Sequence, residues 1–280
     1  MKREVGLFMI KKINQTRQPG RSLPRWFTSS VRAILIKPFI YIVTLFFLLI
    51  LWHWGSVSLN MAMLPTPKAT LIALARLFTA NTIQSHLLAS FNRVFLSILL
   101  SFVIGLPLGL VIGYERFPDR FFSPLIYLLY PIPKIVFMPL IIVFMGLGDA
   151  SRIFLIVFIL VFQVIVTTRD AVKKIPEEML DSLYALGGKR RNAYLHVLLP
   201  SALADVLTTL RLSVGMAFAV LFLAETYAAR LGLGYLIMDS WTRVEYADMF
   251  AAILTMALLG VAFFLVIDLL EWRLCRWRRS

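Results

Sequence analysis

Four charged side chains lie in or at the ends of long apolar stretches of this sequence: Arg93, Lys134, Arg211 and Glu225. A charge inside a membrane-spanning segment is expensive, so it usually faces protein or water, where it pairs with another charge or attracts a charged solute. The chemistry that these residues offer is therefore electrostatic. They can hold helices together, or they can line a pathway for an ion.

Arg93 shares one helical face with three serines, because the four positions repeat at helical spacing: Ser90, Arg93, Ser97 and Ser101. Two interpretations stay open. Arg93 faces protein or water, or it extends its side chain to the nearby membrane surface.

Lys134 follows two prolines, Pro131 and Pro133, near the middle of an apolar segment. Proline removes a backbone donor and clashes with the preceding turn, so the helix should bend or break here. Non-helical backbone at membrane depth is tolerated only where it is buried in protein or lines a cavity. Lys134 either lines such a cavity or reaches the membrane surface.

Arg211 and Glu225 lie in one apolar segment, on nearly the same helical face. They could form a cross-helix pair or a gate. We expect the broken third segment and this fifth one to line a translocation path, whose candidate residues are Arg93, Pro131, Pro133, Lys134, Arg211 and Glu225.

No catalytic or metal-ligating constellation accompanies these charges. The three histidines, His53, His86 and His196, are scattered, and the single cysteine, Cys275, can form no disulfide within the chain. The sequence also has no Gly-rich phosphate-binding loop. We therefore expect no metal, no cofactor and no enzymatic activity, and any ATP must be hydrolysed by another chain.

The segments that carry these residues are long enough to cross a membrane, since 60% of the chain is hydrophobic and a spanning helix needs about 20 mainly apolar residues. Six windows qualify: 38–54, 87–113, 121–145, 153–168, 202–224 and 249–270. The sequence predicts an all-α polytopic membrane protein of about six transmembrane helices. Its parts are a basic N-terminal segment at 1–37, one transmembrane domain at 38–272 and a basic tail at 273–280.

The net charge of +14 is distributed as in a membrane protein. Most lysines and arginines fall in four segments, residues 1–37, 114–120, 169–200 and the tail after 270. Cytoplasmic segments carry such an excess, so both termini and the 169–200 loop should be cytoplasmic, with the basic ends near anionic lipid. No nucleic-acid recognition module accompanies the charge.

Two local patterns predict structure without chemistry. Gly105, Gly109 and Gly113 recur every fourth residue, which favours close packing against another helix. In the external segment 55–86, Thr66-Pro67 is typical of a helix start.

The cytoplasmic loop at about 173–200 should contain a short amphipathic helix. Pro176 with two following glutamates is typical of a helix start, and apolar residues then recur at helical spacing up to Leu186. Gly187 should end this helix in a left-handed conformation. We expect a second short helix from Asn192 to Leu199. This loop is either an ordinary helix on the bilayer or a lever that receives force from a soluble partner.

The loop resembles the EAA loop of permease subunits of binding-protein-dependent ABC importers. Asp181-Ser182-Leu183 takes the place of the acidic-Ala-Ala triplet, and Gly187 with Val197-x-Leu199-Pro200 keeps the family frame. Further motifs resemble the branch for taurine, alkanesulfonates, nitrate or bicarbonate, and thiamine-pyrimidine precursors: Ser90-x-x-Arg93-Val94, Gly105-x-Pro107-Leu108-Gly109, Pro131-x-Pro133 with Pro139, Gly146-x-Gly148, Arg211, Ala224-Glu225 and Gly232-Leu233-Gly234-Tyr235.

The resemblance implies a multi-pass permease of a bacterial inner membrane that imports a small, anionic solute. Its partners would be an ABC ATPase, an extracytoplasmic substrate-binding protein and a second copy of itself. The implied coupling residues are Glu178, Asp181, Ser182, Leu183, Leu186, Gly187, Val197, Leu199 and Pro200. The alternative is an ion-coupled secondary transporter. Such a protein should show charged or polar groups deep in several spans and usually an internal repeat, whereas this sequence has few deep charges and no repeat.

Overall fold

The computed structural model describes residues 25–59, 61–227 and 229–275, and these form helices without any strand. In chain order the elements are α2 (Arg25–Leu59), α3 (Pro67–Thr79), α4 (Thr82–Tyr114), α5 (Arg116–Leu129), η1 (Lys134–Phe137), α6 (Met138–Met145), α7 (Asp149–Lys173), α8 (Glu177–Ala185), α9 (Arg190–Asn192), η2 (Ala193–Leu198), α10 (Leu199–Thr226), α11 (Leu233–Thr242) and α12 (Tyr246–Leu274).

The chain divides into two units, residues 1–59 and 60–280. The first contains the long helix α2, whose segment Ile42–Leu59 is apolar enough to span a membrane. The predicted basic segment 1–37 lies largely outside the described residues. The second unit carries the candidate site.

Five described helices are long and apolar enough to cross a membrane, or six if α5 and the η1–α6 segment count as one broken span. That pair is bent by 85°, at the position of Pro131 and Pro133. The prediction of an all-α membrane fold with one proline-broken span is therefore confirmed.

α4 and α7 pack closely because glycines remove the side chains between them. A Cβ atom built at Gly105 would lie 2.8 Å from Cβ of Val164, and one at Gly113 would lie 2.8 Å from Cβ of Val172. At Gly109 it would meet the carbonyl oxygen of Ile165 at 2.8 Å. The predicted close packing of this stripe is confirmed.

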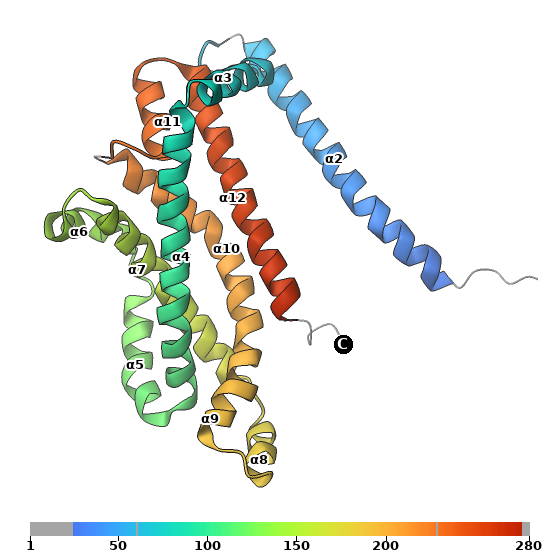
Figure 1. Cartoon of the computed structure of the whole chain (residues 1–280), viewed down its shortest axis with the longest axis vertical. Coiled ribbons are helices and arrows are strands. Elements are labelled where there is room, and N and C mark those ends of the chain that lie inside the picture. The colour runs from blue at the N-terminus through green and yellow to red at the C-terminus, as the bar shows by residue number, and fades with distance from the viewer. Residues whose placement is uncertain (1–24, 60, 228, 276–280) are drawn as a thin grey trace, which may run out of the picture. The chain divides into compact units, whose positions relative to one another are not determined.

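α10 lies at the centre of the second unit. Its buried residues Val206, Val214 and Leu221 join the main hydrophobic core with Leu155 and Leu160 of α7. Figure 1 shows α8 and α9 together at one end of the unit, and α3 and α11 at the opposite end. At that opposite end α3 begins as predicted, since Oγ1 of Thr66 accepts a hydrogen bond from the backbone N–H of Ala69 at 3.2 Å.

The prediction of a separate helix from Asn192 to Leu199 is wrong. α9, η2 and α10 form one helical run from Arg190 to Thr226, which continues into the span. Residues 193–198 adopt a wide π-helical turn, and Pro200 lies in the first turn of α10. Pro200 removes a backbone donor inside this run. In a spanning helix a local π-helical adjustment can re-satisfy the freed backbone groups, so the helix continues.

Candidate functional site

Arg93 does not extend to the membrane surface. Its side chain is only 5% exposed, and its Nη1 donates to Oε1 of Glu225 at 2.6 Å and to the carbonyl of Leu231 at 2.8 Å. Its Nε and Nη2 donate to Oδ1 of Asp149 at 2.9 and 2.7 Å. Arg93 of α4 thus joins the start of α7 to the end of α10.

Glu225 is fully buried and is satisfied on both carboxylate oxygens. The Ser90 hydroxyl lies 2.8 Å from Oε1, and the backbone N–H of Gly234 donates to Oε2 at 2.8 Å. Gly232 has φ +134°, and a Cβ there would lie 2.5 Å from the Glu225 oxygens. The Gly232-Leu233-Gly234 segment therefore folds directly around this carboxylate, and only glycine fits at its first position.

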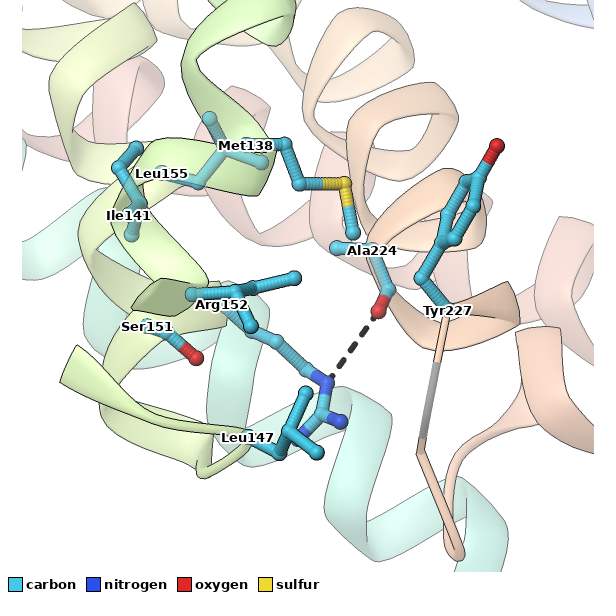
Figure 2. Close-up of a pocket in the computed structure, with 9 residues that line it drawn as sticks. Met138, Ile141, Leu147, Ser151, Arg152, Leu155, Ala224 and Tyr227 are labelled. Carbon is cyan, nitrogen blue, oxygen red and sulfur yellow. Dashed lines mark hydrogen bonds between the residues drawn. The ribbon is translucent and has the colours of Figure 1, made fainter. Parts of the chain in front are cut away.

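Arg152 is a second buried cation beside this pair. Its Nε donates to the carbonyl of Ala224 at 3.2 Å, and its Nη1 lies 3.4 Å from Oδ1 of Asp149. Figure 2 shows the side chain directed at that carbonyl, with the guanidinium beside Leu147. The adjoining cavity of about 10 Å³ has room for about one water molecule and not for a solute. We name Ser90, Arg93, Asp149, Arg152 and Glu225 the Arg93–Glu225 cluster.

Arg211 lies apart from this cluster. It donates to Oδ1 of Asp268 on α12 at 2.8 Å, and its side chain is 35% exposed. Arg211 and Glu225 each form an ion pair with another helix, Arg211 with Asp268 of α12 and Glu225 with Arg93 of α4.

Lys134 faces a hollow at the break between α5 and η1. Its Nζ donates to the carbonyls of Leu129 and Tyr130 at 3.4 and 3.3 Å, which are carbonyls at the broken helix end. It also lies 4.7 Å from the ring centroid of Phe162. The hollow measures about 330 Å³ and is lined by Tyr130, Pro131, Ile132, Pro133, Lys134, Ile135, Ile159, Phe162, Gln163, Met216 and Val220. We name it the Lys134 hollow.

Gln163 is a polar residue in the Lys134 hollow that the sequence reasoning missed. Its Oε1 accepts from the buried hydroxyl of Ser213 at 2.6 Å, and its Nε2 lies 3.8 Å from Sδ of Met216. The signal was present, because Gln163 is the one amide in the apolar run 153–166. An isolated amide in such a run is expensive unless it has a partner.

The loop at about 173–200 contains the predicted helix as α8, and this helix ends as predicted. Gly187 has φ +79°, and the backbone N–H groups of Gly187 and Gly188 donate to the carbonyls of Tyr184 and Leu183, both at 2.9 Å. This is a Schellman cap, which needs the left-handed conformation that glycine adopts readily.

The predicted coupling residues divide by exposure. Leu183 is half-buried and packs against Gly188. Exposed members are Glu178, Asp181, Ser182, Leu186 and Gly187, with Leu186 at 89%. Val197 is buried, and Leu199 and Pro200 are half-buried at the start of α10.

Contacts that the sequence did not indicate attach this loop to α4. The Tyr114 hydroxyl meets the Tyr184 hydroxyl of α8. Glu115 accepts from Nε of Arg190 at 2.9 Å and from the Tyr194 hydroxyl at 2.7 Å. The hydrogen bond from Arg190 holds the pKa of Glu115 below its ordinary value of 4.5.

In the described part of the chain, no group of three or more histidine, cysteine, aspartate or glutamate side chains could hold a metal ion. The arrangement instead offers a buried structural cluster, a hollow that carries a cation, and an exposed amphipathic helix. None of these is a catalytic constellation.

The comparisons agree with these features. Residues 105–276 match the model of the binding-protein-dependent transport system inner membrane component family. The chain is 29% identical to the taurine transport system permease protein TauC of Escherichia coli (strain K12), covering 84% of this chain and 88% of that one. It is 29% identical to the putative aliphatic sulfonates transport permease protein SsuC of Bacillus subtilis (strain 168), covering 81% and 82%.

A third relative is the formylaminopyrimidine transport permease protein ThiX of Halalkalibacterium halodurans, at 28% identity over 85% of this chain and 96% of that one. Among solved structures, an inward facing conformation of the MetNI methionine ABC transporter matches with a TM-score of 0.58 and 18% identity, covering 69% of this chain and 95% of that one. This last likeness concerns the fold. The chain belongs to the family of inner membrane components of binding-protein-dependent transport systems, as a multi-pass transport subunit and not an enzyme.

Proposed function

We propose that this chain forms the path for a small anionic solute in an ABC importer, and that a separate ATPase drives it through α8. Two relatives are named for taurine and aliphatic sulfonates, which carry a sulfonate group. The ion-coupled alternative finds no support in the family assignment. In this proposal the two termini and α8 are cytoplasmic, while α3 and α11 are external.

The observation that carries the proposal is the exposed apolar surface of α8. Met179 of α8 is 52% exposed, and Leu186, the C-cap residue of α8, is 89% exposed, although α8 belongs to a loop rich in charge. Apolar side chains grouped on an amphipathic helix outside the spans favour a protein partner. We infer that the partner is the ATPase.

The contacts of the loop support a route for the coupling. Tyr184 of α8 meets Tyr114 at the end of α4, and Arg190 pairs with Glu115. Arg190 also begins the helical run that continues as α10. A displacement of α8 by the ATPase would therefore move α4 and α10, two spans of the bundle, between inward and outward arrangements.

The Lys134 hollow supports an anionic solute. None of its lining residues is acidic, and none of the ion pairs in the described residues includes Lys134. We infer that the hollow faces the path between two copies of the chain, because a lysine and proline-freed carbonyls cannot face lipid cheaply. An extracytoplasmic binding protein would deliver the solute to the external side.

Exchange of Leu186 for aspartate tests the assignment of α8. Leu186→Asp should leave the chain in the membrane but abolish co-purification of the ATPase, because a charge replaces the exposed apolar contact. Val244→Asp is the matched control, since Val244 is 65% exposed in the loop before α12 and has φ +62°, which aspartate tolerates. Normal ATPase recovery with Leu186→Asp would refute the proposal.

A further inference from the structure

Gln163 is held in one orientation by Ser213. The Ser213 hydroxyl is buried and lies 2.6 Å from Oε1 of Gln163, and it shares its proton with the carbonyl of Thr209 at 2.8 Å. With the amide oxygen engaged by α10, the Nε2 group faces the Lys134 hollow, where it contacts the sulfur of Met216 at 3.8 Å. Sulfur is a weak acceptor, so this amide donor is available to a ligand.

Lys134 and Gln163 both supply hydrogen-bond donors to the hollow, and its lining contains no carboxylate that would compete with a bound anion. The ammonium group interacts with two backbone carbonyls at 3.3 and 3.4 Å, and these are longer than the usual range for a strong hydrogen bond. The rest of the lining is apolar or aromatic, including Ile159, Phe162 and Val220. A volume of about 330 Å³ lies at the lower end of the range for small-molecule sites.

We propose that Lys134 and Gln163 form an anion-binding station in the Lys134 hollow, and that Ser213 is its positioning residue. The ligand class is a small singly charged oxyanion with a short apolar part, such as an alkanesulfonate. The sulfonate oxygens accept from the ammonium and the amide, while the alkyl part contacts the apolar wall. This station deepens the proposed function and rests on it for its place in transport.

Methanesulfonate and dimethyl sulfone form the probe pair, because they have similar shapes and differ in charge. The full chain, carrying Cys275→Ser and Ile132→Cys, is placed in nanodiscs. Ile132 lines the hollow and is 39% exposed, so its replacement reports occupancy through the rate of alkylation by N-ethylmaleimide. Each variant is compared with itself with and without the probe, at constant ionic strength, which cancels any change in thiol reactivity.

Methanesulfonate should slow alkylation and dimethyl sulfone should not. Lys134→Met should abolish this protection, and Gln163→Leu should raise the half-protecting concentration about tenfold, the effect of losing one hydrogen bond to a charged group. Ser213→Ala should raise it less, and Gln163→Asn should retain more protection than Gln163→Leu. The control Thr167→Val, one turn along α7 and outside the lining of the hollow, should match the parent chain.

Equal protection by the two probes, no protection by either, or unchanged protection in both Lys134→Met and Gln163→Leu would overturn the station. The assay needs no ATP and no partner. Its failure while the assembled transporter still imports solute with ATP rejects the station alone. Loss of ATP dependence in the parent transporter rejects the proposed function, whatever the alkylation shows.

Discussion

At the scale of single residues, the Arg93–Glu225 cluster balances two arginines against two carboxylates. Arg93 contacts Asp149 and Glu225, and Arg152 contacts Asp149. Arg93, Arg152 and Glu225 are all buried, so removal of one carboxylate leaves an excess cation in a region of low dielectric. Such a change is expensive even when the replacement has the same shape.

Glu225→Gln should therefore lower the free energy of unfolding by about 3–5 kcal/mol. Asp268→Asn is the matched control, because it removes the carboxylate of Arg211 from a pair whose members are 35% and 47% exposed, and it should cost no more than about 1 kcal/mol. Unfolding of the purified chain in detergent measures both. Equal losses for the two variants would show that burial does not determine how much the Arg93–Glu225 cluster contributes to the free energy of unfolding.

At the scale of elements, the glycine stripe fixes the distance between α4 and α7. A methyl group at Gly109 would meet the backbone carbonyl of Ile165 at 2.8 Å and Cγ2 of Thr168 at 2.9 Å. A carbonyl in a helix cannot turn aside as a flexible side chain can, so the helices themselves must separate.

Gly109→Ala should destabilise the chain by about 1–3 kcal/mol, as overpacking does. Gly215→Ala in α10 is the control, because a Cβ there would have no atom within 4 Å and alanine is favoured in a helix by about 1 kcal/mol. The midpoint temperature of thermal unfolding in detergent should thus fall for Gly109→Ala and rise for Gly215→Ala. A shift of this temperature in the same direction for both variants would contradict the close packing of α4 and α7 at Gly109.

The link between α4 and the loop that carries α8 should depend on pH through Glu115. Because Arg190 lowers the pKa of this carboxyl in the folded protein, the link contributes its full stabilisation above the ordinary value of 4.5 and loses it as the pH falls through the lowered pKa. At neutral pH the contact is intact.

Hydrogen–deuterium exchange of residues 187–194 checks this dependence. Glu115→Gln should exchange faster than the parent chain at neutral pH, after correction for intrinsic rates, and the two should converge in acid. Glu178→Gln removes an exposed carboxylate of α8 and serves as the control. If the ratio of the exchange rates of Glu115→Gln and the parent chain stays constant with pH, the role of Glu115 is contradicted.

At the scale of the whole molecule, the proposed orientation in the membrane rests on the distribution of lysine and arginine. Cys275 is buried and is a poor labelling site, so Lys68→Cys and Lys189→Cys are made in a Cys275→Ser background. Both lysines are exposed. An impermeant maleimide added to intact cells should label the Lys68→Cys chain, and should label the Lys189→Cys chain only after lysis. The reverse pattern would invert the proposed topology.

The sequence was sufficient for features that depend on local order. Hydropathy gave the spans, spacing gave the stripe at Gly109, and the prolines beside Lys134 gave the broken helix. Gly187 was predicted to be left-handed because a helix ending in glycine is a local signal.

Features that join distant segments were not predictable in the same way. Arg93 pairs with Asp149 and with Glu225 across separations of 56 and 132 residues, and periodicity within one helix does not reveal a partner on another. Arg152 and Gln163 were missed for the same reason, since the partner that explains each polar side chain lies on α10.

Uptake into proteoliposomes that contain this chain, its ATPase and its binding protein tests the central claim most directly. Uptake of radiolabelled solute is measured with ATP supplied either on the side of the membrane that carries the ATPase or on the opposite side. It is measured again with ionophores that collapse proton and sodium gradients. We expect uptake to require ATP on the side of α8 and to be unchanged by the ionophores. Uptake that persists without ATP and stops when the gradients collapse would contradict an ATP-driven importer and restore the ion-coupled alternative.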